Sequence, residues 1–132
     1  MTTNNAAGRS RRLDTGWPPA RKAGCCYTLH YRDPIGNTAD PRGWAQHYVG
    51  WSAEHCLEGR VADHREGRCG VPLVMAFWRA GIPFAVVSVE RGVTRDRENQ
   101  LKLKGASRRC PACQGLVSWE QAAAAEQGLV TP

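Results

Sequence analysis

Two segments of the chain, CCYTLHY at residues 25–31 and WAQHYVGW at residues 44–51, are rich in aromatic and other residues that favour extended strands. The first segment is followed by Pro34 and Gly36, which are typical of turns and loops. We therefore predict that the two segments are the strands of one hairpin. Their connection, about residues 32–43, is long for a hairpin, and loops of this length often have a function.

A helix is expected directly after the second strand. Ser52 can act as its N-cap, apolar residues recur at helical spacing up to about Glu66, and Gly67 can end the helix. The next helix is predicted at about residues 72–80, because a proline stands in its first turn and a glycine follows its end.

The remaining part of the chain predicts one more strand and two more helices. IPFAVVSVE, residues 82–90, contains an apolar run that suits a central strand. Thr94 can cap a helix that ends at Gly105, and Ser118 begins an alanine-rich segment with the spacing of a capping box. This order of elements predicts an α/β fold with a three-stranded, mostly antiparallel sheet flanked by helices.

The length of 132 residues suits one domain with a modest core. Residues 1–22 are small, polar and basic without periodicity, so we predict a disordered basic arm there. The globular domain is expected at residues 23–115, with a C-terminal helix or tail at residues 116–132. No segment approaches the roughly 18 apolar residues that cross a bilayer, and no secretory signal is recognisable. We expect a cytoplasmic protein that has no contact with a membrane.

The charge and the cysteine content indicate the classes of partner that this chain favours. The net charge is +6, and only three of the basic residues are lysines. Because arginine binds phosphate through two parallel hydrogen bonds, this composition favours a polyanionic partner. The six cysteines have no secretory context, so free thiols or a metal site are expected rather than disulfides.

Five polar side chains suited to phosphodiester chemistry lie on the predicted hairpin and on two of the helices: Tyr27, Tyr48, Arg60, His64 and Glu98. In this order the chain resembles the GIY-YIG nuclease superfamily, as a small single-domain bacterial or phage member. Cys25-Cys26-Tyr27 stands where the family has its first tripeptide, and Tyr48-Val49-Gly50 stands where it has the second. Arg60 and His64 match the arginine and histidine of the family's first helix, and Glu98 matches its metal-binding glutamate. The resemblance covers about residues 25–113.

The resemblance implies a metal-dependent endonuclease that hydrolyses phosphodiester bonds in DNA, or in RNA. Its cutting would be selective for the structure of the nucleic acid, or only weakly selective. Glu98 would hold one Mg²⁺ or Mn²⁺, and Arg60 would bind the scissile phosphate. Tyr48 or Tyr27 would take the proton from the attacking water. His64 would orient Arg60 or move a proton. No small-molecule cofactor is expected.

Further residues are expected to contact the nucleic acid. The backbone at Gly50 can approach a phosphate without a side chain in the way. Trp51, which follows it, can stack on a base. Lys102, Arg108 and Arg109 are basic residues that can contact the sugar-phosphate backbone.

Two departures from the family pattern support a second hypothesis. The first tripeptide lacks its glycine, and no asparagine follows Asn99, where the family often has one after the glutamate-bearing helix. A catalytically impaired nucleic-acid-binding or accessory protein on the same scaffold is therefore the alternative. The Glu98 and Lys102 side chains, four residues apart on a helix, can also form a plain surface ion pair.

A third hypothesis concerns the Cys110-Pro-Ala-Cys113 segment. A structural zinc ion needs four ligands, and this segment supplies two. The other candidates show no second paired spacing: Cys25, Cys26, Cys56, Cys69 and His55. We therefore expect reduced thiols or a redox-sensitive pair at Cys110 and Cys113, and a small zinc-supported interaction module is the weaker alternative.

Overall fold

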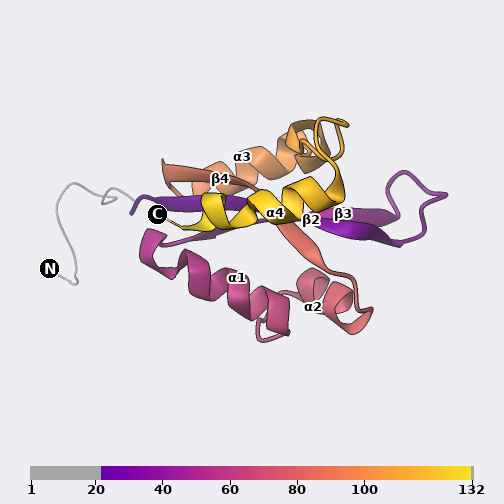
Figure 1. The fold of residues 1–132 in the computed structure, drawn as a ribbon, viewed down its shortest axis with the longest axis horizontal. Helices are drawn as coiled ribbons and strands as arrows, with labels where there is room; N and C mark the ends of the chain where they lie inside the picture. The colour runs from indigo at the N-terminus through magenta and orange to yellow at the C-terminus, as the bar shows by residue number, and fades with distance from the viewer. Residues whose placement is uncertain (1–21, 132) are drawn as a thin grey trace, which may run out of the picture.

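The computed structural model describes residues 22–131, which form a three-stranded antiparallel sheet with helices on both sides (Figure 1). In chain order the elements are β2 (Gly24–Gly36), β3 (Trp44–Ser52), η1 (Glu54–Cys56), α1 (Leu57–Glu66), α2 (Pro72–Arg79), β4 (Phe84–Val93), α3 (Asp96–Lys104), η2 (Ala106–Arg109) and α4 (Trp119–Val130). The predicted α/β class and the predicted sheet are confirmed. Within the described residues, no helix is both long enough and apolar enough to span a membrane.

The strand order is β3-β2-β4, so the central strand is β2. The prediction that residues 82–90 form a central strand is wrong, because β4 lies at an edge of the sheet. Its apolar run has another cause. Phe84 and Val86 pack into the core on one face of the sheet, while Ala85 and Val87 pack into a second core on the other face. An edge strand that is covered on both faces has the same composition as a central strand.

One face of the sheet carries the larger core, beneath α1 and α2 (Figure 1). Alternate residues of β2 point into it, and Tyr31 stacks on Phe77 of α2 with ring centroids 3.6 Å apart. Leu57 and Val61 supply the apolar positions of α1. Because side chains of a strand alternate between the two faces, the next residues along β2 point away from this core.

The opposite face is covered by α3, whose Leu101 packs against Cys26 and Val49. The last helix, α4, packs along β4 and begins with the predicted capping box at Ser118. The Glu126 carboxylate on α4 accepts a hydrogen bond from the backbone N–H of Val86 at 2.9 Å. The C-terminal helix is therefore attached to the sheet.

Two predicted helix caps are wrong. Ser52 is buried at the end of β3, and its hydroxyl donates to the carbonyl of Ala53. A turn of 3₁₀-helix, η1, intervenes, so α1 begins at Leu57. Likewise α3 begins at Asp96 after Arg95, and Thr94 contributes no side-chain cap.

The strands extend beyond the predicted bounds. β2 continues to Gly36, which shortens the predicted hairpin loop to residues 37–43, and the pairing of β2 with β3 shifts register between His30 and Ile35. Of the predicted basic arm at residues 1–22, all but Lys22 lies outside the described residues, so the arm stays a prediction.

Candidate functional site

Tyr27 and His64 form the buried centre of the site predicted from the sequence. Tyr27 lies on β2, His64 lies on α1, and the Tyr27 hydroxyl is 2.8 Å from Nε2 of His64. Burial raises the pKa of Tyr27 to about 12. Burial, together with the charge of Arg60, lowers the pKa of His64 to about 4. At neutral pH the pair is therefore a neutral phenol and a neutral imidazole.

Tyr48 lies on β3 beside this pair. Its ring centroid is 6.3 Å from that of Tyr27 and 5.4 Å from that of His64, which it meets edge-on. Burial raises the pKa of Tyr48, and the negative charge of Glu98 raises it further. Tyr48 is half-buried, whereas Tyr27 is not exposed at all, so Tyr48 is the tyrosine that solvent reaches.

Gly50 is paired with Tyr27 across the β2–β3 ladder and is buried beneath both tyrosine rings. A Cβ atom at this position would lie 2.5 Å from the Tyr27 ring and hydroxyl and 2.8 Å from the Tyr48 ring. The packing of the two rings therefore requires glycine here. A contact between the Gly50 backbone and a phosphate stays a prediction.

Arg60 lies on α1, one turn before His64, and its side chain is exposed. Its guanidinium interacts with the Tyr27 hydroxyl, which lowers the pKa of that hydroxyl against the larger effect of burial. The η1 turn lies between Gly50 and Arg60 and leads directly into α1. The guanidinium is thus beside the two tyrosines and remains accessible to a ligand.

Glu98 and Lys102 lie one turn apart on α3, which packs against the edge strand β3. The predicted ion pair is present, with Nζ of Lys102 2.8 Å from the Glu98 carboxylate. Nζ of Lys102 also lies 5.9 Å from the centroid of the Tyr48 ring. The negative charge of Glu98 acts on both Tyr27 and Tyr48, so this carboxylate belongs to the same neighbourhood.

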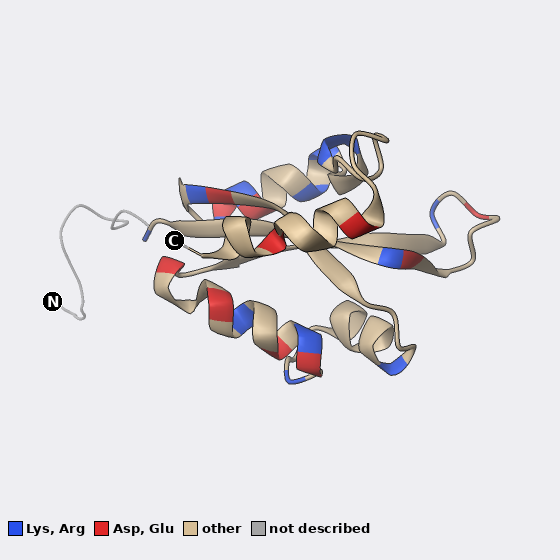
Figure 2. Cartoon of the chain, in the orientation of Figure 1, with Lys and Arg blue, Asp and Glu red and all other residues tan. Residues whose placement is uncertain are grey.

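An open groove of about 800 Å³ begins at Tyr48 and Lys102 and follows β3 toward His47 and Cys113. One wall is the start of α2, residues 71–73, and the other comes from Ala106 and Ser107 of η2, among others. Lys and Arg residues recur on α3 and η2 beside this groove, interspersed with acidic residues on α3 (Figure 2).

The other residues predicted to contact nucleic acid lie away from the two tyrosines. Trp51 projects to the face of β3 opposite to Tyr48, where its indole N–H donates to the carbonyl of Val93 and the Arg95 guanidinium lies over its ring. The structure therefore does not bring Trp51 to the tyrosines, because residues an odd number of positions apart on a strand point to opposite faces. Arg108 and Arg109 are exposed on η2, and Arg109 lies 3.4 Å from Glu90.

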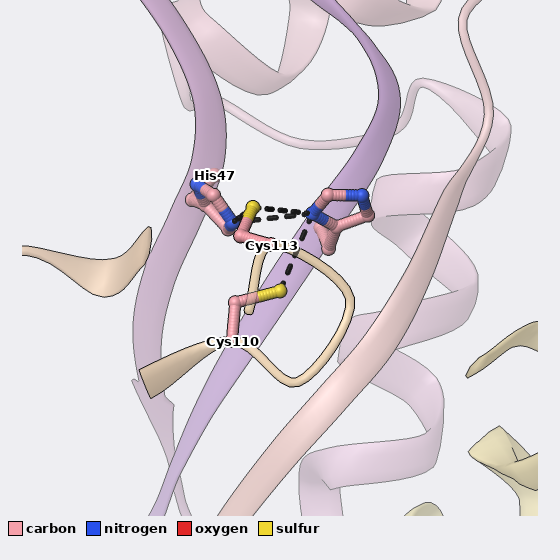
Figure 3. A group of neighbouring side chains, drawn as sticks. His47, Cys110 and Cys113 are labelled. Atoms are coloured by element: carbon pink, nitrogen blue, oxygen red, sulfur yellow. Dashed lines mark hydrogen bonds between the residues drawn. The ribbon is translucent and has the colours of Figure 1, made fainter. Parts of the chain in front are cut away.

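A second cluster lies at the other end of the groove and joins β2, β3 and the segment after η2: His30, His47, Cys110 and Cys113 (Figure 3). Their side-chain donor atoms all lie within 4.8 Å of one another and can hold a metal ion. Burial raises the pKa of the Cys110 thiol, but hydrogen bonds with His30 and His47 outweigh it and lower the pKa to about 5.

The further zinc ligands considered from the sequence were four other cysteines and His55, and both histidines of this cluster were missed. Cys56 and His55 lie instead on the exposed η1 turn, and Cys69 follows α1. A usable signal was present in the predicted hairpin. His30 and His47 are direct partners in the antiparallel ladder, so a correct register alone would have placed them side by side.

Comparison of the chain with protein-family models, with curated proteins and with solved structures finds no match.

Proposed function

We propose that this protein is a metal-dependent endonuclease of the GIY-YIG type that hydrolyses phosphodiester bonds in DNA. One observation supports the proposal above all others. Four separate elements of the fold bring five chemically suited side chains into one neighbourhood, of which Tyr48 lines the groove: Tyr27, Tyr48, Arg60, His64 and Glu98. Hydrolysis of a phosphodiester needs a proton acceptor for water and positive charge beside the phosphate oxygens, and this set contains both.

We propose that Tyr48 accepts the proton of the attacking water. It lines the groove, whereas Tyr27 is buried behind it. The Tyr27 hydroxyl and His64 form a hydrogen-bonded pair at the back of the site, 2.8 Å apart, which holds both rings against Tyr48. Tyr27 and His64 thus act as positioning residues in this mechanism.

We propose that Arg60 binds the scissile phosphate. Its guanidinium is exposed, always charged, and can donate two parallel hydrogen bonds to phosphate oxygens. Its interaction with the Tyr27 hydroxyl keeps it beside the tyrosines. The phosphate and the attacking water would therefore meet between Arg60 and Tyr48.

Glu98 would hold the divalent cation. The ion would supply positive charge that stabilises the charge developing on the phosphate oxygens. A carboxylate suits hard cations such as Mg²⁺, and the charge of Glu98 is already balanced here by a cation, the Lys102 ammonium. Among the described residues, Glu98 belongs to no group of three or more His, Cys, Asp or Glu side chains that could hold a metal, so the ion would keep most of its water.

The groove favours recognition of the backbone and shape of the nucleic acid. Most of its lining is apolar or uncharged, and Lys102 is its one formally charged lining residue among those described. The basic residues of α3 and η2 lie beside it and suit contacts with phosphates, which carry no sequence information. We therefore expect the protein to select DNA by its structure, or only weakly, and not by its base sequence.

The test is incubation of the purified protein with branched, nicked and linear DNA, and with RNA of matched shape, with Mg²⁺, with Mn²⁺ and with EDTA. The proposal requires cleavage of at least one DNA substrate that depends on the added metal. An absence of metal-dependent cleavage on every substrate would contradict it. Cleavage of RNA in place of DNA would retain the chemistry and change the substrate.

The Glu98–Lys102 ion pair favours one alternative, a nucleic-acid-binding protein without catalysis. If Lys102 keeps this carboxylate at 2.8 Å in the presence of Mg²⁺, the ammonium neutralises the charge that would attract the ion. This alternative predicts DNA binding that weakens steeply with salt, and no cleavage at any metal concentration.

A further inference from the structure

We propose that His30, His47, Cys110 and Cys113 form a closed structural zinc site that fastens the segment after η2 to the β2–β3 hairpin. This site lies apart from the five residues assigned to catalysis. Zinc binding here requires only the arrangement of the four side chains and is independent of the proposed nuclease activity.

The distances between the donor atoms fit a tetrahedral zinc ion. Typical zinc–nitrogen and zinc–sulfur bonds place neighbouring ligand atoms about 3.3 to 3.8 Å apart. Here Nδ1 of His30 lies 3.1 Å from Nε2 of His47, 3.4 Å from Sγ of Cys110 and 3.6 Å from Sγ of Cys113. Sγ of Cys113 lies 3.3 Å from Nε2 of His47. The two remaining pairs, Sγ of Cys110 with Sγ of Cys113 and with Nε2 of His47, lie within 4.8 Å. Shifts of about 1 Å or less would therefore give all four atoms zinc-ligand spacing.

The source of each ligand also favours a built site (Figure 3). His30 and His47 are direct partners on neighbouring strands, so the sheet fixes one half of the site. Cys110 and Cys113 lie on a tight turn in which the N–H of Gln114 donates to the carbonyl of Cys110 at 3.0 Å. A paired rung and a Cys-x-x-Cys turn each hold two ligands in place before the ion arrives.

Charge and burial agree with zinc in particular. Two thiolates and two neutral imidazoles around Zn²⁺ give a net charge of zero, which suits a place where Cys110 and His30 are buried. Sulfur and imidazole ligands select zinc over Mg²⁺ or Ca²⁺. Four protein ligands leave no open position for a substrate, so the site is structural. His47 and Cys113 are the more accessible pair and provide the path by which the ion enters.

The position of the site gives it a consequence for the groove. Residues 106–109, which form η2, directly precede Cys110, and Ala106, Ser107 and Cys113 line the groove. His47 lies at the same end. A zinc ion held by these ligands would keep this wall of the groove, with the exposed Arg108, at a constant distance from β3.

The experiment uses the full chain, purified under reducing conditions, incubated with Zn²⁺ and freed of loosely held metal, with zinc measured by mass spectrometry. The ligand variants are Cys113→Ser and His47→Gln. The matched controls are Cys56→Ser and His55→Gln, which change an exposed cysteine and an exposed histidine outside the cluster. We expect about one zinc per chain in the parent and in both controls, and loss of most of it in both ligand variants.

A second measurement, the absorption spectrum of bound Co²⁺, does not depend on how much zinc the protein acquired during purification. Co²⁺ added to the metal-free chain should give the visible bands of tetrahedral cobalt and a thiolate charge-transfer band, and Cys113→Ser should weaken the latter. A chelator should lower the melting temperature of the parent and of Cys56→Ser, and should leave that of Cys113→Ser unchanged.

Three outcomes would overturn the proposal: a zinc-loaded parent that holds no metal, a Cys113→Ser chain that holds as much as the parent, or a Cys110–Cys113 disulfide as the stable form under reducing conditions. Circular dichroism identifies a variant that has failed to fold. If His47→Gln does not fold, Cys113→Ser decides the matter, because Cys113 is exposed and its replacement by serine conserves its size.

Discussion

The hydroxyl of Tyr27 and Nε2 of His64 lie 2.8 Å apart in the interior of the protein, and they join the central strand to α1 across 37 positions of the chain. Both side chains are almost completely buried. The contact satisfies the Tyr27 hydroxyl and Nε2 of His64, whereas Nδ1 of His64 is buried without a hydrogen-bond partner in the described structure, so this contact offsets much of the cost of burying the two groups. The same contact stabilises the fold and holds the proposed site.

Tyr27→Phe removes this contact and leaves a polar atom of His64 buried without a partner. We expect the free energy of unfolding to fall by about 1–3 kcal/mol, measured by chemical denaturation. Tyr31→Phe is the matched control, since the Tyr31 hydroxyl is buried without a hydrogen-bond partner in the described structure. Its removal should be neutral or stabilising. Equal losses in the two variants would show that the Tyr27–His64 contact has no special value.

Stability should fall as the pH is lowered from 7 to 4 because of His64. Its pKa is lowered to about 4 in the folded state and returns to its ordinary value near 6.5 on unfolding, so the unfolded chain binds more protons between these values. The stability is fully present above about pH 6.5, and about 3 kcal/mol of the free energy of unfolding is lost by pH 4.

Release of zinc would add its own pH dependence, so the comparison of the parent with His64→Gln isolates the effect of His64. Denaturation curves at several pH values should show a shallower loss for His64→Gln than for the parent. His55→Gln, which changes an exposed histidine, should follow the parent. Parallel curves for the parent and His64→Gln would contradict the assignment.

Gly50→Ala and Gly59→Ala should have opposite effects on stability. A Cβ at position 50 would lie 2.5 Å from the Tyr27 ring, so we expect a loss of about 1–3 kcal/mol from overpacking. At position 59, inside α1, a Cβ meets nothing within 4 Å, and alanine should add about 0.5–1 kcal/mol. Thermal or chemical denaturation measures both changes. An unchanged free energy of unfolding in Gly50→Ala would show that the two tyrosine rings can make room for a methyl group.

The rate of DNA cleavage should rise with pH. Burial and the charge of Glu98 raise the pKa of Tyr48, so its proton-accepting form is a small fraction at neutral pH. We expect the single-turnover rate to increase about tenfold per pH unit from pH 6 to 8, and to lose this dependence together with most of the rate in Tyr48→Phe. A flat profile in the parent, or an unchanged profile in Tyr48→Phe, would remove Tyr48 from this role.

The sheet and most helices could be predicted from the sequence because their signals are local. Strand-favouring residues, helix-ending glycines and the capping box at Ser118 act within a few residues of their position. The caps at Ser52 and Thr94 were mispredicted for a physical reason. The hydroxyl of Ser52 donates to the carbonyl of Ala53, the residue after β3, and α1 follows a 3₁₀ turn that has no side-chain cap.

Long-range geometry could not be predicted in this way. The apolar run of β4 suggests a central strand, yet it reflects burial on two faces at the edge of the sheet. His30 and His47 meet Cys110 only because of the ladder register and the path of the chain after η2. Tyr27, Arg60 and His64 were placed together through the family resemblance, since no local pattern of residues specifies contacts between different elements.

The most direct test of the central claim is the single-turnover rate of metal-dependent DNA cleavage by the parent, Glu98→Gln and Glu58→Gln. Glu58 is an exposed carboxylate on α1 and serves as the control for loss of a negative charge. DNA binding without metal should be similar in all three. We predict that Glu98→Gln cuts at least about a hundredfold more slowly than the parent while Glu58→Gln cuts normally. A Glu98→Gln chain that cuts DNA as fast as the parent would contradict the account.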